Sequence, residues 1–356
     1  MRREVPVSLS FASNTSGRET RRAMRVELKK RKEKMKMTRR ILAMLMALVM
    51  VFALAACGGD SGEADNGEEV LSADELKAQV DEIIAGLTVP ENIDPATVQG
   101  VEDGVLTIAM ECAYAPYNWT QIDDSNGAVP ISTASGSYAN GYDVMISQII
   151  CNIYGWELEI AASAWDSLTP GVQSGIYDAN IAGQSMTADR MEQVDMAGPY
   201  YYADIVVVTT ADSEYADAQS IADLAGGTAT AQSGTIWYDS CLPQIPDVEL
   251  EPPAETAPQM IMSLTTGQVD YICTDIPTAT AAVRNNDGLK ILNFAGTDGD
   301  FQFATEEERA ENVNIGISVQ KGNETLRDAM NAVLEQMDAD DFNTIMNYAI
   351  AIQPEI

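Results

Sequence analysis

The sequence of 356 residues contains no histidine, and none of its five cysteines forms a Cys-x-x-Cys pair. Zinc sites in proteins are built mainly from cysteine and histidine, so these absences argue against a zinc site. We expect no metal ion and no cofactor. Without histidine, an enzyme built on this chain would need a carboxyl group with a raised pKa as its acid or base.

Basic residues are also scarce outside the N-terminus. Residues 1–56 hold 14 of the 21 lysine and arginine residues, which leaves 7 basic against 50 acidic side chains in the remainder. So acidic a body is repelled by nucleic-acid phosphates and by anionic lipid headgroups. Nucleic acid is therefore excluded as a partner.

No apolar run has the length of a typical membrane-spanning helix. Ile41–Ala56 has 16 uncharged residues, whereas a spanning helix needs about 20. A basic stretch before this run and small residues after it are typical of a secretory signal, so we expect residues 1–56 to be removed. The alternative is an uncleaved single-pass anchor, which also places the body outside the cytoplasmic membrane. Residues 1–36 are polar and lack periodicity, so we expect translation to begin at Met35 or Met37.

The residues Leu54-Ala55-Ala56-Cys57-Gly58 resemble the bacterial lipobox, in which the cysteine is lipidated and becomes the mature N-terminus. The resemblance implies lipidation of Cys57, and each buried acyl CH₂ then contributes about 0.8 kcal/mol to membrane anchoring. Residues 57–100 would form an acidic tether and a short helix that starts at a capping box, Ser72-x-x-Glu75. The other cysteines lie in apolar runs typical of buried thiols, and a disulfide among them stays open: Cys112, Cys151, Cys241 and Cys273.

From Gly104 onward, short apolar strands alternate with helices. Strands are predicted at Val105–Met110, Trp156–Ile160, Asp178–Gly183, Ala203–Thr210, Thr228–Gln232, Val269–Cys273 and Asn314–Val319. Helices are predicted around Val144–Ile153, Leu168–Val172, Met260–Leu264, Ala279–Val283, Leu326–Met337 and Phe342–Ile350. The alternation predicts an α/β fold of mostly parallel sheets covered on both faces. Ligands of such folds bind at the carboxyl ends of the strands.

Eight short segments at or near strand ends carry a further signal. They include Ala113–Tyr117, Gly141–Val144, Trp165–Leu168, Ser185–Arg190, Pro199–Tyr201, Gln232–Thr235, Thr274–Asp275 and Gly316–Gly322. None is specific alone. In this order, over about residues 105–335, they resemble the bacterial extracellular solute-binding proteins of family 3, which bind polar amino acids.

The resemblance implies a two-lobed, periplasmic-binding-protein-like (type II) fold with mixed sheets and a hinge. One lobe would comprise residues 101–202 and 315–356, and the other residues 203–314. The implied function is to capture an amino acid, or a close analogue, between lobes that close around it, and to deliver it to the permease subunits of an ABC importer. The protein would be a monomer held by lipid on the outer face of the cytoplasmic membrane.

Two other functions stay open. The first is a secreted dehydratase-like enzyme on the same fold, but nothing in the sequence singles out a catalytic carboxyl group, so we expect no enzyme. The second is a ligand-sensing module for a receptor, which a span and a signalling domain after the body would favour. The sequence ends at Ile356 without them.

An amino-acid ligand needs a partner for each of its charges, because burying an unpaired charge is costly. Arg190 is the candidate for the carboxylate, since a guanidinium offers two parallel N–H donors. Thr187 would be a helix N-cap, which places Arg190 in the first turn, where backbone N–H groups also favour an anion. The alternative is a surface ion pair of Arg190 with Asp189 or Glu192.

The resemblance implies that Asp275 receives the ligand ammonium, and Asp275 also precedes Ile276-Pro277 as a helix N-cap. Thr235 and the Ile236 amide would complete the carboxylate site. The family often has threonine where Ile236 stands, so one hydroxyl is missing from this sequence.

Four further residues are implied for the site. Gly183 and Ser185 would add carbonyl and hydroxyl contacts, and Tyr114 and Trp165 would wall the pocket. The alternative for both aromatic residues is an ordinary place in the core. Residues 121–140 form a longer, more polar connection than the family has, which we interpret as an inert surface loop near the mouth of the cleft. The alternatives are that it shapes ligand access or contacts the permease. The sequence does not determine which amino acid is bound.

Overall fold

The computed structural model describes residues 71–354, apart from the side chains of Glu306 and Glu311. The predictions for the signal segment, for lipidation at Cys57 and for most of the acidic tether lie outside the described residues. Among those residues, no helix combines the length and the apolar character that crossing a membrane requires.

The first of two five-stranded sheets has the order β6-β1-β7-β14-β8. Strand β1 (Val105–Met110) lies second in this order and pairs in parallel with β6 (Glu157–Ala162) and β7 (Ala179–Asn180). β14 (Ile315–Val319) runs antiparallel to both β7 and β8 (Asp195–Tyr201). We call this sheet, with the helices packed on it, the first lobe.

The second sheet has the order β11-β10-β12-β9-β13. β10 (Thr228–Thr230) lies parallel to β11 (Glu249–Leu250) and β12 (Tyr271–Asp275), whereas β9 (Ile205–Thr210) is antiparallel to β12 and β13 (Leu289–Leu292). This sheet and its helices form the second lobe. The expectation of mostly parallel strands thus holds for only half of each sheet. The antiparallel pairs involve the strands next to the points where the chain passes between the sheets, which periodicity alone does not reveal.

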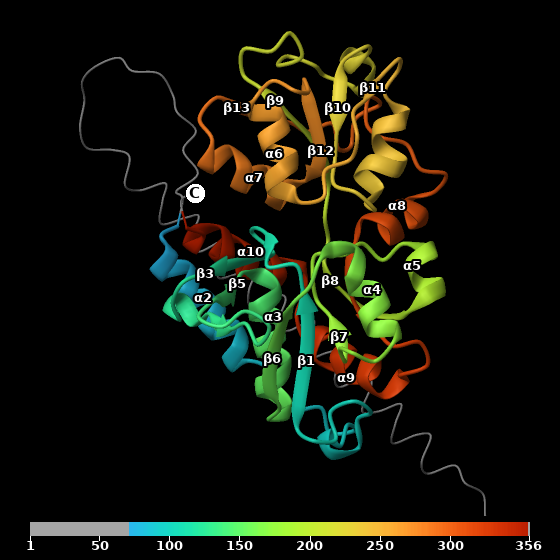
Figure 1. The fold of residues 1–356 in the computed structure, drawn as a ribbon. Helices are drawn as coiled ribbons and strands as arrows, with labels where there is room; N and C mark the ends of the chain where they lie inside the picture. The colour runs from blue at the N-terminus through green and yellow to red at the C-terminus, as the bar shows by residue number, and fades with distance from the viewer. Residues whose placement is uncertain (1–70, 355–356) are drawn as a thin grey trace, which may run out of the picture. The chain divides into compact units, whose positions relative to one another are not determined.

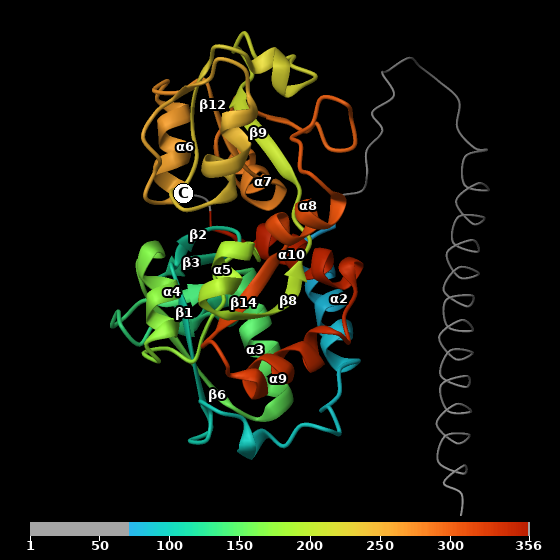
Figure 2. The ribbon, with the colours of Figure 1, turned by 90° about the vertical axis from the view of Figure 1, so that its right-hand side faces the viewer.

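Two stretches of chain connect the lobes, as Figures 1 and 2 show. Residues 202–204 lead from β8 to β9, and residues 293–314 lead back to β14. The carboxyl ends of β1 and β7, and that of β10, lead into the segments described below as the site. The exact lobe boundaries expected from the sequence stay a prediction.

Helices cover the sheets. They are α2 (Ala73–Ala85), α3 (Tyr142–Tyr154), α4 (Trp165–Gln173), α5 (Ala188–Gln193), α6 (Ala257–Thr265), α7 (Ile276–Asn285), α8 (Glu306–Val313), α9 (Glu324–Leu334) and α10 (Ala339–Ile352). Short helical turns lie at η1 (Pro95–Thr97), η2 (Ser125–Gly127), η3 (Ile221–Leu224), η4 (Trp237–Cys241) and η5 (Leu242–Gln244). In the first lobe α4 packs on β1, β7 and β14, α3 on β6, and α9 on β8.

Local signals account for several helix ends. The predicted capping box begins α2, because Ser72 and Glu75 each accept a hydrogen bond from the other's backbone nitrogen. α2 buries Leu76 and Val80 and packs on α10, which fits the expected packing helix. α3 ends at Gly155 with φ of 74°, the left-handed conformation that glycine adopts without a Cβ penalty.

Residues 121–140 are not a loop throughout, because part of the segment forms strands; its interpretation as inert stays a prediction. A small antiparallel sheet, β2-β3-β5-β4, takes in both ends of the segment: β2 (Ala113–Tyr114), β3 (Asn118–Gln121), β4 (Val129–Pro130) and β5 (Tyr138–Asn140). Ile131 is buried and forms a bridge to Ile160 of β6. The apolar residues within this polar stretch anchor it to the first lobe.

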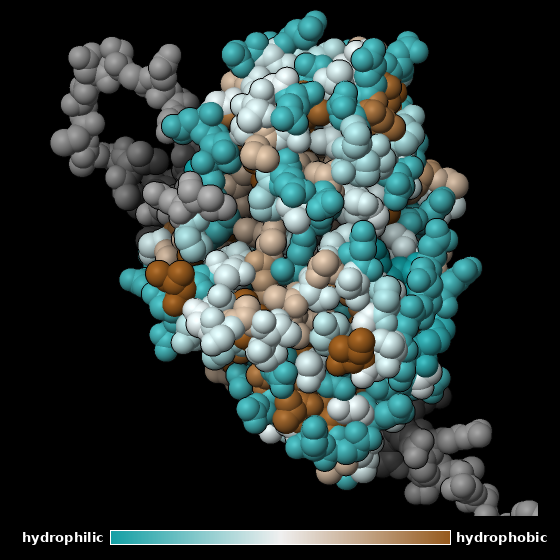
Figure 3. Space-filling model, viewed as in Figure 1, coloured by the Kyte–Doolittle hydropathy of each residue, from teal (hydrophilic) through white to brown (hydrophobic). Residues whose placement is uncertain are grey.

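A continuous core of aliphatic and aromatic side chains runs through residues 71–354. Cys112, Cys151, Cys241 and Cys273 are buried as free thiols, as their apolar surroundings in the sequence indicated. The face in Figure 3 is mostly hydrophilic, with strongly hydrophobic residues scattered over it. This agrees with the acidic composition of the body.

Candidate functional site

A cavity of about 560 Å³ opens between the lobes. Seven of the eight predicted ligand-binding residues line it: Tyr114, Trp165, Gly183, Ser185, Arg190, Thr235 and Ile236. The first five come from segments of the first lobe, and the last two follow β10 in the second. The eighth, Asp275, is absent from the lining.

Arg190 lies in α5, and Thr187 caps this helix as expected, because its hydroxyl accepts the Arg190 backbone N–H at 3.2 Å. The guanidinium donates from Nη1 to the carbonyl of Ser185. Burial lowers the pKa of Arg190 to about 10, so the group stays protonated at neutral pH. The alternative surface pairs with Asp189 and Glu192 do not form among the described side chains.

All seven basic residues of the acidic body lie within residues 71–354. Five of them form ion pairs with carboxylates: Lys77, Lys290, Arg309, Lys321 and Arg327. Arg284 donates to the carbonyls of Ile350 and Ala351 at the end of α10. Arg190 is thus the one cation that lines the cavity, and it has no ion pair with a carboxylate placed by the structure.

Gly183 follows β7 with φ of 63°, and no side chain would fit there. A Cβ at this position would lie 2.7 Å from Cε1 of Tyr114 and 3.1 Å from Cγ of Tyr117. These two rings stack with their centroids 5.1 Å apart. The absence of a side chain therefore lets the backbone turn directly beside these two rings, which together with Trp165 we call the aromatic wall.

The aromatic wall touches the second lobe. Trp165, at the start of α4, lies edge-on to Tyr114, with ring centroids 6.2 Å apart. A Cβ on Gly234 of the second lobe would lie 3.5 Å from the Trp165 indole nitrogen. Trp165 and Tyr114 are both buried and also line the site, so the core and pocket interpretations apply together.

The second lobe contributes Thr235 and Ile236, which immediately precede η4. The Thr235 hydroxyl donates to the Gln232 carbonyl at 2.7 Å. A ligand carboxylate would have to take this donor from that carbonyl. The Ile236 side chain is buried, and the role expected of this residue in the carboxylate site belongs to its backbone amide.

Asp275 is fully buried behind Tyr114. It is the N-cap of α7, because Oδ1 accepts the Thr278 backbone N–H at 2.9 Å, as the sequence indicated. Its Oδ2 accepts from Tyr114 Oη at 3.1 Å, a hydrogen bond that joins the lobes. Burial raises the pKa of Asp275. The expected contact with a ligand ammonium stays a prediction, and it requires Tyr114 to move.

A second interlobe cavity, of about 760 Å³, lies beside Trp165 and Asp166 and contains a residue that the sequence analysis missed. Glu111 follows β1, and its Oε2 accepts from Gln232 Nε2 of the second lobe at 3.2 Å. Burial raises the pKa of Glu111 to about 7, and the charge of Asp166 adds to this effect. Its place directly after the carboxyl end of β1 was the signal available in the sequence.

The predicted excursion 121–140 contributes no residue to either of these cavities. The alternative role of this segment in ligand access therefore has no direct contact to support it. The lining instead combines one partly buried cation, Arg190, with several carboxylates: Asp166, Asp189, Asp239 and Glu308 in the first cavity, and Glu111, Asp166 and Glu255 in the second.

Comparison with known proteins identifies the family model that this sequence matches. The model described as bacterial extracellular solute-binding proteins, family 3, matches residues 106–348. The match spans both sheets and every residue predicted for the ligand site.

Individual relatives are amino-acid-binding proteins of ABC transporters. The putative ABC transporter arginine-binding protein 2 of Escherichia coli (strain K12) is 26% identical over 68% of this chain and 89% of its own length. The arginine-binding extracellular protein ArtP of Bacillus subtilis (strain 168) is 21% identical over 83% and 92%. A crystal structure of an amino acid ABC transporter substrate-binding protein from Streptococcus pneumoniae Canada MDR_19A, bound to L-arginine, superposes with a TM-score of 0.59. It is 23% identical and covers 73% of this chain and 99% of that chain, so it supports the two-lobed type II fold.

Proposed function

Because the chain belongs to the bacterial extracellular solute-binding proteins of family 3, we propose that it captures an amino acid between its lobes and delivers it to an ABC importer. The observation that carries the proposal is Arg190, the cation of the interlobe cavity that lacks a carboxylate partner among the described side chains. A half-buried guanidinium in this state binds the carboxylate of a ligand favourably.

The ligand that we propose is a cationic amino acid, with L-arginine as the first choice. Glu111 supports it, because among the described residues the hydrogen-bond partner of this partly buried carboxyl group is the neutral Gln232. Trp165 and Asp166 line both cavities, so a long side chain that passes Trp165 would extend from Arg190 toward Glu111. The relatives named above are described as arginine-binding, which agrees with this choice.

The further elements of the proposal concern cellular context. The body would be a monomer held by lipid on Cys57 at the outer face of the cytoplasmic membrane, and the closed, ligand-bound form would contact the permease subunits of the importer. Contacts that already join the lobes include the hydrogen bonds of Tyr114 with Asp275, Glu111 with Gln232, and Arg284 with Ile350. Ligand binding would add to these contacts and so favour closure.

Calorimetric titration with three related compounds tests the proposed ligand. L-arginine carries both charges that the site would recognise, L-citrulline lacks the side-chain cation, and agmatine lacks the carboxylate. We expect L-arginine alone to bind tightly. At 100 times its Kd it should stabilise the protein by about 2.7 kcal/mol. Equal affinity for L-arginine and agmatine would refute the role of the carboxylate.

The Arg190→Ala variant tests the observation itself. Removing one member of a buried charge pair costs about 2–5 kcal/mol, so the Kd for L-arginine should rise by at least about 30-fold. Arg327→Ala is the matched control, since it also removes a cation, from an ion pair with Asp328 outside the cavity. Unchanged affinity in Arg190→Ala would remove Arg190 from the site.

A further inference from the structure

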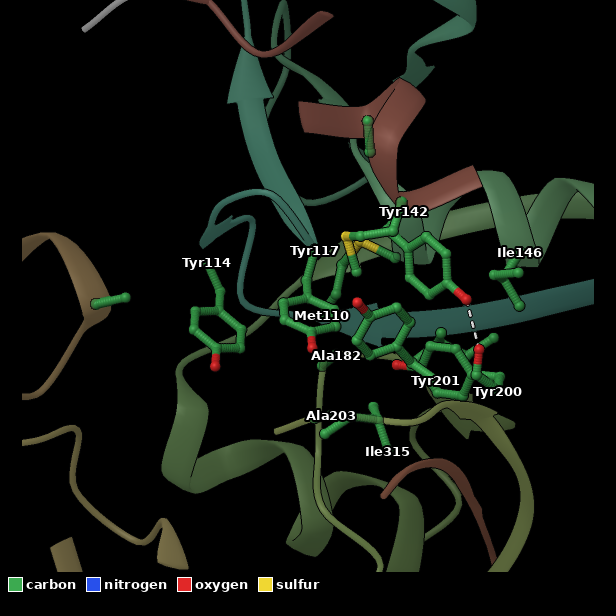
Figure 4. Close-up of a cluster of buried hydrophobic side chains, with 14 of the residues drawn as sticks. Met110, Tyr114, Tyr117, Tyr142, Ile146, Ala182, Tyr200, Tyr201, Ala203 and Ile315 are labelled. Carbon is green, nitrogen blue, oxygen red and sulfur yellow. Dashed lines mark hydrogen bonds between the residues drawn. The ribbon is translucent and has the colours of Figure 1, made fainter. Parts of the chain in front are cut away.

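The Gly141–Val144 motif contains a carboxylate that the ligand cavity does not use. Asp143, in the first turn of α3, is 0% exposed. Tyr142 and Tyr200 stack beside it with ring centroids 5.8 Å apart, and Figure 4 shows them within a larger group of tyrosine rings. Leaving a carboxyl group in such surroundings is costly unless its oxygens are hydrogen-bonded.

Both oxygens of Asp143 have side-chain donors. Oδ1 accepts from Tyr200 Oη at 2.7 Å, and Oδ2 accepts from Asn118 Nδ2 at 2.7 Å. Each of these donors is itself buried and comes from a different strand, β8 or β3. Asp143 therefore connects two strands from the start of a helix.

The two donors in turn hold backbone N–H groups. Tyr200 Oη accepts from the Gly183 nitrogen at 3.0 Å, and Asn118 Oδ1 accepts from the Cys112 nitrogen at 2.7 Å. Cys112 has φ of 56°, a conformation that residues other than glycine seldom adopt and that its surroundings must maintain. Gly183 lines the first cavity, and Cys112 follows Glu111 of the second.

We call these four hydrogen bonds, which run from Gly183 and Cys112 through Tyr200 and Asn118 to Asp143, the relay. The direction of each of them is fixed. A tyrosine hydroxyl has one proton, and because it goes to Asp143, the oxygen lone pairs remain for the Gly183 N–H. The Cys112 N–H requires the carbonyl end of the Asn118 amide, so the amino end must face Asp143. Both side-chain donors thus point toward Asp143, whose two oxygens accept one hydrogen bond each.

We propose that Asp143 is a positioning residue for ligand binding. Through Tyr200 it holds Gly183, and through Asn118 it holds Cys112, so that one buried carboxyl group sets the spacing of two chain segments that line the ligand cleft. Its effect on affinity rests on the function proposed above, whereas its effect on the two backbone segments does not.

The Tyr200→Phe variant breaks the relay and keeps the ring. Tyr154→Phe is the matched control, because Tyr154 also lies buried in the first lobe and its hydroxyl donates one hydrogen bond, to the Ala329 carbonyl at 2.7 Å. The full-length variants are titrated with L-arginine, and their amide hydrogen exchange is followed in peptides covering residues 111–114 and 183–185. Exchange needs no ligand and reports local opening.

We expect both variants to lose similar thermal stability, but only Tyr200→Phe to exchange faster at 183–185. If a tenth of its molecules keep a competent cleft, the Kd for L-arginine rises about tenfold. If amide hydrogen exchange and the Kd for L-arginine equal those of Tyr154→Phe, the proposed positioning role of Asp143 is refuted. If the wild-type protein binds no amino acid, the proposed function fails, and the exchange rates alone still decide the relay. Should Tyr200→Phe not fold, Asp143→Asn gives the same test, since its amide can accept from one of the two donors and turns an N–H group toward the other.

Discussion

The proposed pairing of Glu111 with a ligand cation makes binding depend on pH. Burial raises the pKa of Glu111 to about 7, so the ligand-free protein holds a proton there below neutrality. A guanidinium beside Glu111 favours the ionised form and lowers that pKa. Binding must then release the proton, and affinity must fall as the pH drops below 7.

The magnitude follows from linkage. Above pH 8 Glu111 is already ionised and the Kd for L-arginine should be constant. At pH 6 about nine molecules in ten must lose a proton first, so the Kd should be about tenfold higher than at pH 8. Proton release should be near one per ligand at pH 6 and about half at pH 7.

Calorimetric titrations at pH 6 and pH 8, each in two buffers of different ionisation enthalpy, measure both the Kd and the number of protons released. Glu111→Gln serves as the control, because it keeps the size of the side chain and removes the titrating group. At pH 8 the Kd of this variant should be higher than that of the wild type, and it should stay nearly constant from pH 6 to pH 8. A wild-type Kd that does not change over this range, with no buffer-dependent heat, would refute the pairing of Glu111 with the ligand.

Two further predictions concern the first lobe. Gly183→Ala should lower the melting temperature in differential scanning calorimetry, because a Cβ would lie 2.7 Å from Tyr114 at a φ of 63°; unchanged melting would show that the turn relaxes freely. Burial raises the pKa of Asp143 to about 7 from 3.8, so the folded state binds more protons than the unfolded state between these values. Denaturant titrations should therefore show the wild-type free energy of unfolding falling, relative to Asp143→Asn, by roughly 1 kcal/mol per pH unit from pH 4 to pH 7. A constant difference over that range would contradict the raised pKa.

Signals that act within one turn were readable from the sequence. Ser72, Thr187 and Asp275 were each expected to cap a helix, and each accepts the backbone N–H three residues on. The reason is physical: a cap involves only neighbouring residues, so the pattern of types suffices. The family resemblance added the grouping of seven residues around one cavity, which no local pattern supplies.

Contacts between distant segments were not readable. β7 was expected over Asp178–Gly183 but is only Ala179–Asn180, because the Asp178 carboxylate accepts the Thr107 N–H and Gly183 turns the chain. Glu111 escaped notice since its partner Gln232 is 121 positions away. The burial of Asp275 behind Tyr114 likewise depends on how two lobes meet.

The charge balance of the cleft argues for a cationic ligand over a neutral one. Asp275 is buried and Glu111 is partly buried, and neither forms an ion pair with a cation that the structure places. The charge of Asp275 contributes to the raised pKa of Asp143. A neutral amino acid brings one positive and one negative group, and its carboxylate would engage Arg190, which leaves a single positive charge for these acids. A ligand with a second cation can compensate Asp275 and Glu111 together. Because each unpaired buried anion disfavours the closed state, the second cation should add directly to the free energy of closure.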